Sequence, residues 1–262
     1  MKDASGEARA QKPTLSPDPT LELLIHARSQ DDLIAAASDG RLTEDLALSF
    51  LNRRDLPPKA LEALHKNSAL AKHKKVRLAI VMHPRTPRHI SIPIIRHLYP
   101  FELMHVALFP SVPADVKRMA EETITGRIGT ISPGERYTLA KQGSGRVAAA
   151  LLLDEEERIM LAALSNPQMT EGWIAKALRA DKGTQTLARA VCIHTRWSRR
   201  LEVKTALLIN RHTTLAQVAQ FADDLPVNVL KDVLYSTRLE ARVKSYLKSV
   251  VQKRTSRQSA LP

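Results

Sequence analysis

Basic side chains are the residues of this sequence whose type and spacing point most directly to a chemical role. Arg196, Arg200 and Lys204 lie four residues apart, so on one helix they would form a continuous cationic strip. Like charges at this spacing destabilise a helix by about 0.2–0.5 kcal/mol per pair. The presence of three such cations in a row therefore favours a functional role for them. Such a strip would bind an anion. The alternatives are a solvated surface and pairing with Asp223 and Asp224 of a neighbouring repeat.

A second basic stretch, residues 72–97, contains no Asp or Glu. The whole chain carries 40 Lys and Arg against 27 Asp and Glu, a net charge of +13. This excess favours an anionic partner, although a solubilising surface would carry it too. The two basic stretches are residues 72–97 and residues 176–204. Their candidate anion- or partner-binding residues are Lys74, Lys75, Arg77, Arg85, Arg88, Arg189, Arg196, Arg199, Arg200 and Lys204.

Motifs for metal, nucleotide or acid–base chemistry are weak. Nine histidines are present without an HExxH pair, and a metal site would need three or four converging ligands. The acidic run at residues 154–157 precedes an apolar helical stretch. Carboxylates at that position accept hydrogen bonds from the free N–H groups of the first turn and stabilise the helix dipole. Residues 143–146 lack the Lys-Ser/Thr ending of a phosphate-binding loop and indicate a turn between helices. We therefore expect no cofactor, no metal and no small-molecule substrate.

The two tryptophans have two interpretations. Trp173 and Trp197 could stack on nucleic-acid bases, but a large aromatic at helical spacing is more often part of a core. Aromatic residues make up only 4% of the chain. For a nucleic-acid partner, contacts to the phosphates of a structured molecule are therefore favoured over base stacking.

Short helices account for almost all of the local sequence signals. The apolar residues are mainly Leu, Ile, Val and Ala, which suits helix-on-helix packing. Residues 132–135 have the spacing of a capping box, and Asp39-Gly40 marks a helix end. Pro93 interrupts the short alternation over residues 90–94, which indicates a helix entry or a 3₁₀ turn rather than a strand.

A recurring turn separates several of these helices. At residues 82–87, 165–170 and 209–214, Asn or His follows an apolar run, and Thr follows after Pro or polar residues. Asn or His would end one helix and Thr would cap the next. The same pattern predicts capping and turn roles for His83, His194 and His212. Repeated turns indicate stacked helical units, although their spacing is irregular.

The unit is clearest at residues 166–170, Asn-Pro-Gln-Met-Thr, and it resembles the HEAT-like and leucine-rich-repeat-variant proteins of bacteria. The resemblance covers residues 45–250. It implies a superhelical scaffold that binds proteins or nucleic acid, with no active-site residues shared across the group. The predicted fold is all-α, a right-handed α-solenoid of irregular short helical repeats.

The predicted organisation is a single repeat domain at residues 19–252, between disordered tails at residues 1–18 and 253–262. One cysteine, Cys192, excludes an intramolecular disulfide. Residues 1–19 lack the apolar core of a signal peptide, and no apolar run reaches the ~18 residues of a membrane span. These features predict a monomeric, cytoplasmic protein without a membrane partner.

The sequence thus predicts a non-enzymatic helical-repeat scaffold whose basic face engages a nucleic acid, a ribonucleoprotein or an acidic protein. One alternative is a HEAT-like DNA glycosylase acting on damaged DNA, with Trp173, Trp197, Arg199 and Asp181 as site residues. An acidic side chain beside a tryptophan, at the centre of a basic face, would favour that alternative. The other alternative is a protein–protein assembly scaffold whose charge is incidental.

Overall fold

The computed structural model describes residues 23–24, 26–181 and 183–259, without the side chains of residues 257–259. All regular secondary structure in this part of the chain is helical, with 16 α-helices and one 3₁₀ helix. The prediction of an all-α fold is confirmed. The tail predicted at residues 1–18 lies outside the described residues.

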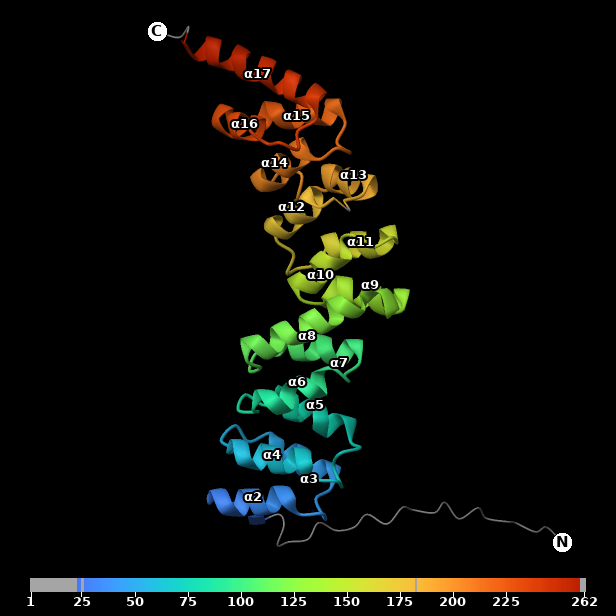
Figure 1. Cartoon of the computed structure of the whole chain (residues 1–262), viewed down its shortest axis with the longest axis vertical. Coiled ribbons are helices and arrows are strands. Elements are labelled where there is room, and N and C mark those ends of the chain that lie inside the picture. Colours follow the sequence, from blue (N-terminus) through green and yellow to red (C-terminus); the bar gives the residue numbers. More distant parts are fainter. Residues whose placement is uncertain (1–22, 25, 182, 260–262) are drawn as a thin grey trace, which may run out of the picture. The chain divides into compact units, whose positions relative to one another are not determined.

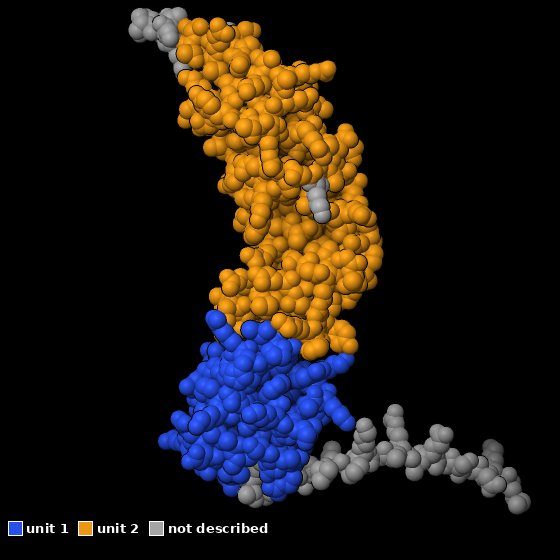
Figure 2. Space-filling view, viewed as in Figure 1, with its two compact units in different colours: residues 1–94 blue, residues 95–262 orange. Residues whose placement is uncertain are grey.

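Two compact units make up the chain, residues 1–94 and residues 95–262 (Figure 2). The first unit contains α2 (Gln30–Ser38), α3 (Glu44–Leu51), α4 (Pro58–Lys66), α5 (Lys74–Met82) and most of α6 (Arg88–Ile95). The second unit contains α7 (Pro100–Leu108), α8 (Ala114–Arg127), η1 (Ile128–Thr130), α9 (Pro133–Gln142), α10 (Gly145–Leu151), α11 (Glu157–Leu164), α12 (Glu171–Arg179), α13 (Gln185–Ile193), α14 (Leu201–Ile209), α15 (Leu215–Asp224), α16 (Val227–Leu234) and α17 (Ala241–Ser259).

Helices within each unit pack on the helix two places along the chain as well as on immediate neighbours. In the first unit α2 packs on α4, and α3 packs on α5. In the second unit one series runs through α8, α10, α12, α14 and α16, and another runs through α7, α9, α11 and α13 (Figure 1). This step of two is consistent with a repeat-like array of helix pairs.

The core consists mainly of aliphatic and small side chains. Apart from α8 and α17, the helices have seven to ten residues, which is too short for stability in isolation. Each therefore depends on its buried face, and alanines such as Ala36, Ala120 and Ala175 are fully buried in those faces. Small buried residues allow neighbouring helices to approach closely.

Helix starts and ends follow several of the sequence signals. Ser132 begins α9 in a capping box, because its Oγ accepts from Glu135 N–H at 3.4 Å and the Glu135 carboxylate accepts from Ser132 N–H at 3.2 Å. Thr214 and Gln217 form the same arrangement at the start of α15. α2 ends at Ser38 with Asp39 as its C-cap, as predicted. Residues 90–94 are helical and not a strand, but they lie inside α6, with Pro93 in the helix, and do not form a helix entry or a 3₁₀ turn.

The recurring Asn/His turn connects a helix to the helix two places earlier. We call Asn67, His83, Asn166 and Asn210 the bridging residues. Each accepts, at its side-chain oxygen or Nδ1, the N–H of the residue two positions later, at 2.7–3.2 Å. Each also donates from its side-chain nitrogen to a main-chain carbonyl at or near the end of an earlier helix.

The bridging residues bind carbonyls at or just beyond a helix end, where the helix itself supplies no N–H donor. Asn166 Nδ2 donates to Ala140 O at 2.8 Å and to Gly143 O at 3.0 Å, and its side chain is fully buried. His83 Nε2 donates to Arg53 O at 2.8 Å. The predicted helix-ending role of Asn and His is confirmed, and the structure adds that the same side chains join successive helix pairs.

The threonine half of the predicted turn holds in only part of the chain. Thr214 caps α15 as expected. Thr170 occupies the N-cap position of α12, but its side chain makes no capping hydrogen bond. For Thr86 the prediction is wrong, because this buried hydroxyl donates to Ile80 O of the preceding helix instead.

The last helix extends beyond the point where we expected a disordered tail. α17 continues through residues 253–259. Arg254 accounts for this continuation, since its Nη1 donates to Leu225 O at 2.9 Å and its Nη2 contacts the Asp223 carboxylate at 3.0 Å. The guanidinium group thus attaches the end of α17 to the end of α15.

Candidate binding surfaces

The basic residues of the first unit are in different environments. Lys74, Lys75 and Arg88 are exposed in the first turns of α5 and α6. Cations at a helix start oppose the helix dipole, which is a local cost. Arg85 Nη1 donates at 2.9 Å to a carbonyl in the α3–α4 turn, and Arg77 is half-buried with its Nε lacking a hydrogen-bond partner among the described residues. Arg85 is therefore partly structural.

The cationic strip predicted from Arg196, Arg200 and Lys204 is wrong as a single helix face. α13 ends at residue 193, residues 195–199 form a turn, and Arg200 only caps α14. Lys204 Nζ lies 2.6 Å from Asp224 Oδ2, so it makes the pairing that the sequence offered as an alternative. Helical continuity fails because Trp197 turns into the core.

Trp197 has a bridging role in that turn. Its indole is 2% exposed, and Nε1–H donates to Leu164 O of α11 at 2.8 Å. The Arg196 guanidinium lies over the ring, 4.1 Å from the ring centroid. The core interpretation is confirmed for Trp197, and Arg196 covers the indole from the solvent side.

The remaining candidates of the second unit point to solvent. Arg199 and Arg200 are exposed, and their side chains form no ion pair with another described residue. Arg189 lies 3.5 Å from Glu157 in an exposed pair, which contributes little to stability. These three arginines remain available for a partner.

A cationic face that the sequence interpretation missed lies on α17. Arg242, Lys244, Lys248 and Lys253 are exposed, and none pairs with an acid among the described residues. Residues 241–259 contain no Asp or Glu. The acid-free run was visible in the sequence, but treating residues 253–262 as a tail concealed that most of it belongs to one helix.

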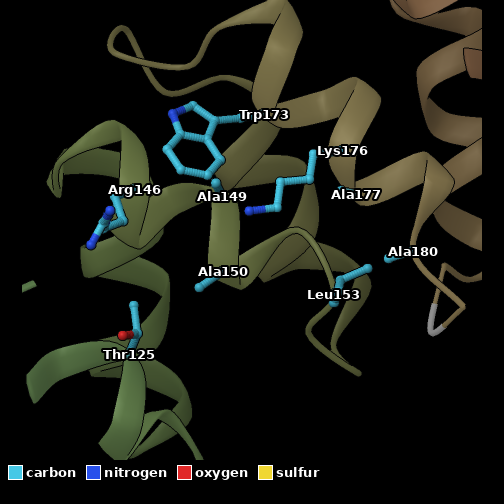
Figure 3. Close-up of a pocket in the computed structure, with 9 residues that line it drawn as sticks. All are labelled: Thr125, Arg146, Ala149, Ala150, Leu153, Trp173, Lys176, Ala177 and Ala180. Carbon is cyan, nitrogen blue, oxygen red and sulfur yellow. The ribbon is translucent and has the colours of Figure 1, made fainter. Parts of the chain in front are cut away.

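A groove in the second unit lies between α8, α10 and α12. It holds about 330 Å³. Its floor is apolar and its polar side chains stand at the rim (Figure 3). The lining residues are Thr125, Arg146, Ala149, Ala150, Leu153, Trp173, Lys176, Ala177 and Ala180.

The rim of the groove combines one aromatic ring with two cations. Figure 3 shows the Trp173 indole next to Ala149, with the Lys176 ammonium directed toward the ring. Lys176 Nζ lies 5.3 Å from the indole centroid and pairs with no acid among the described residues. Arg146 is partly neutralised, since it lies 3.2 Å from Glu122 and 3.7 Å from Glu121. The sequence did not reveal this grouping, because Arg146 is on α10 while Trp173 and Lys176 are on α12.

Titratable groups with displaced pKa values have structural explanations. Burial raises the pKa of the Cys192 thiol to about 11, so the thiol stays protonated at neutral pH. Burial also lowers the pKa of His83 and of His194 below the ordinary value of 6.5. Both rings act in turns, as predicted, and a neutral ring suits the hydrogen bonds that they make.

The acidic run and the glycine pair are part of the packing. Asp154 is buried and pairs with Arg136 of α9 at 3.1 Å. A Cβ at Gly143 would lie 2.4 Å from Leu139 O, and a Cβ at Gly145 would lie 2.5 Å from Gln168 O. A side chain at Gly143 would clash with the last turn of α9, and one at Gly145 would clash with the α11–α12 turn. Residues 143–146 include the connection between α9 and α10, as predicted.

The residues named for a glycosylase do not share a site. Trp173 borders the groove, Trp197 is buried, and Arg199 lies in the turn before α14. Asp181 is in the loop after α12, 3.7 Å from Arg238. No carboxylate lines the groove beside Trp173, so the feature that would favour the glycosylase is not found at that tryptophan.

Among the described residues, no group of three or more His, Cys, Asp or Glu side chains is placed to hold a metal ion. None of the described helices is both long and apolar enough to cross a membrane. No protein-family model matches the chain, and no curated protein or solved structure is significantly similar to it.

Proposed function

We propose that the protein is a non-enzymatic helical-repeat scaffold that binds an anionic partner, and that this partner is a structured nucleic acid. The observation that carries the proposal is the outer face of α17. Four cations are exposed there without acidic partners, Lys244 and Lys248 on one flank of the helix and Arg242 and Lys253 on the other, in a segment of 19 residues that contains no acid. A mixed-charge surface would keep an exposed helix face in water equally well, so the single sign of charge favours a binding role.

Phosphate contacts fit this face better than a membrane does. Ser245, Ser249 and Gln252 are exposed among the cations, and such side chains donate hydrogen bonds to phosphate oxygens. Membrane-surface helices bury large apolar side chains, whereas none of the exposed large hydrophobic residues belongs to α17. Counterion release from phosphates would then supply most of the affinity.

For the array itself we propose the right-handed α-solenoid that the sequence suggested. The packing of helices at a step of two within each unit and the repeated bridging residues support it. An array of this kind presents one turn or helix face per repeat to a long partner. That arrangement suits a nucleic acid, which offers phosphates at regular intervals.

The test is the salt dependence of binding, measured by fluorescence anisotropy with a labelled DNA duplex and a labelled RNA hairpin. Four phosphate contacts predict a slope of about −3.6 for log K against log salt. Lys244→Gln/Lys248→Gln should reduce the magnitude of that slope by about 2. Lys141→Gln/Lys231→Gln removes the same charge from exposed positions outside α17 and should leave the phosphate contacts in place.

Two outcomes would overturn the proposal. If neither nucleic acid binds even at low salt, the partner class is wrong. If both double variants weaken binding equally, the affinity depends on the net charge of the protein and not on its position, and α17 is not the contact surface. Capture of an acidic protein by wild type, with no nucleic-acid binding, would favour the assembly scaffold instead.

A further inference from the structure

The groove between α8, α10 and α12 has the features of a ligand site that α17 does not use. At about 330 Å³ it is at the lower end of the volumes that hold small ligands. Its floor comes from Ala149, Ala150, Leu153, Ala177 and Ala180. The short alanine side chains of α10 and α12 leave this hollow, and the Trp173 indole forms one wall (Figure 3).

The chemistry of the lining limits what can bind there. The floor offers no hydrogen-bonding side chain, and Thr125 is the one neutral polar residue that lines the groove. An extended peptide would need partners for its own main-chain N–H and C=O groups, and the side chains of the groove floor offer none. A flat aromatic ring suits the site better, because its faces need no hydrogen bonds and its polar edge can stay in water.

The charges at the rim favour an anion attached to that ring. Lys176 pairs with no acid among the described residues, and its ammonium lies over one face of the indole in a cation–π contact. Arg146 shares its charge with Glu121 and Glu122 but still borders the groove. No carboxylate lines the site to repel an anion. The complementary ligand therefore has a planar ring and a negative group next to it.

The geometry points to an unpaired nucleotide of a nucleic-acid strand as the ligand of this groove. Its base lies over the alanine floor against Trp173, and its phosphate faces Lys176 and Arg146. This inference rests on the proposed function for its choice of partner, and it assigns a second contact with a different chemistry. α17 contacts backbone phosphates, whereas the groove selects a base that has left the helical stack.

The experiment compares a blunt-ended hairpin with the same hairpin carrying unpaired 3′ nucleotides, using the full-length protein. Wild type should bind the overhang hairpin more tightly. Trp173→Ala should lower that affinity about 5- to 150-fold, the range expected for loss of one stacked base, and should leave the blunt hairpin within about twofold. Trp173→Phe should retain most of the preference because it keeps an aromatic face.

Two further variants distinguish loss of the groove contact from a folding defect. Ala150→Leu fills the groove without removing Trp173, and it should also abolish the overhang preference. Tyr235→Ala removes an aromatic side chain that is 86% exposed and lies outside the groove, and it should change neither affinity. Far-UV circular dichroism of each variant should match wild type.

The failure of each proposal is distinguishable. Equal binding of the two hairpins by wild type, or an equal loss for both with Trp173→Ala, would overturn the groove inference while α17 remains the contact. If neither hairpin binds, the proposed function fails. Titration with adenosine monophosphate, followed by tryptophan fluorescence, then separates the sources. Saturable quenching that Trp173→Ala abolishes, in a protein that shows no preference for the overhang hairpin, would show a free-nucleotide site and overturn the strand as its ligand.

Discussion

The turn after α11 and the turn after α13 meet the same structural need in different ways. After α11, Asn166 alone accepts an N–H from Gln168 and donates to two carbonyls of the preceding pair. After α13 the two roles are divided: His194 accepts the N–H of Arg196, and Trp197 donates to Leu164 O. Because the acceptor and the donor are two different residues, His194 and Trp197, the turn after α13 is longer than the turn after α11. The former spans residues 194–200 and the latter residues 165–170.

The comparison explains why the repeat is irregular in sequence and regular in packing. What recurs is an unpaired carbonyl at a helix end and a donor that comes from about thirty residues later. Asn, His and Trp can all supply that donor. A repeat defined by a hydrogen-bonding position tolerates different residues and different turn lengths.

Removal of Trp197 should have the largest effect, because the indole supplies both packing and the bridge. Trp197→Ala should lower the free energy of unfolding by about 3–5 kcal/mol. Trp197→Phe keeps most of the packing but leaves Leu164 O without its donor, which should cost about 1–3 kcal/mol. Urea unfolding followed by circular dichroism measures both. Equal costs for the two variants would mean that the hydrogen bond contributes nothing.

Asn166→Ala should be the next most harmful, since it removes a bridge that consists of hydrogen bonds alone. Two carbonyls and one N–H lose their partner in a buried site, so we expect about 2–4 kcal/mol. Asn210→Ala offers a milder counterpart, because Asn210 is half-buried and donates one bond. If Asn210→Ala proved the more costly of the two, burial would not govern the strength of these bridges.

His83 should make the stability of its turn depend on pH, unlike the asparagine bridges. Nδ1 accepts from Arg85 N–H and Nε2 donates to Arg53 O, so a second proton would remove one hydrogen bond. Burial lowers the pKa of His83 in the folded chain, so the unfolded chain takes up the proton first. Its contribution is complete above pH 6.5 and is lost as pH falls toward the folded-state pKa.

His83→Asn keeps a donor and an acceptor but cannot titrate. Its free energy of unfolding should fall less than that of wild type when the pH is lowered from about 7.5 to about 5. This interval includes the ordinary histidine pKa of about 6.5. Parallel curves for the two proteins, measured by urea unfolding across this interval, would show that His83 is not the group that responds.

The smallest effect is expected from Lys204, which the sequence placed in the cationic strip. Its ion pair with Asp224 is partly exposed, so Lys204→Ala should cost about 0.2–1 kcal/mol. The same variant should leave the salt dependence of nucleic-acid binding unchanged. A drop in the slope by about 1 would return Lys204 to the binding surface.

The sequence by itself determined the local structure of this protein. Apolar periodicity, the capping residues at 132–135 and the Asn/His turns act over a few residues, and they predicted helices, several helix ends and stacked packing correctly. The strip of Arg196, Arg200 and Lys204 failed because local spacing cannot tell that Trp197 will reach a carbonyl of α11 and break the helix.

Only the tertiary structure decided which side chains are structural and which are free. Arg85 and Arg254 bind main-chain carbonyls of earlier segments, while Arg199, Lys244 and Lys248 remain exposed. Composition counts all of these charges alike. The groove beside Trp173 likewise exists only because three separate helices pack together. Long-range carbonyl pairing and helix stacking involve partners about thirty residues apart, which no local pattern specifies.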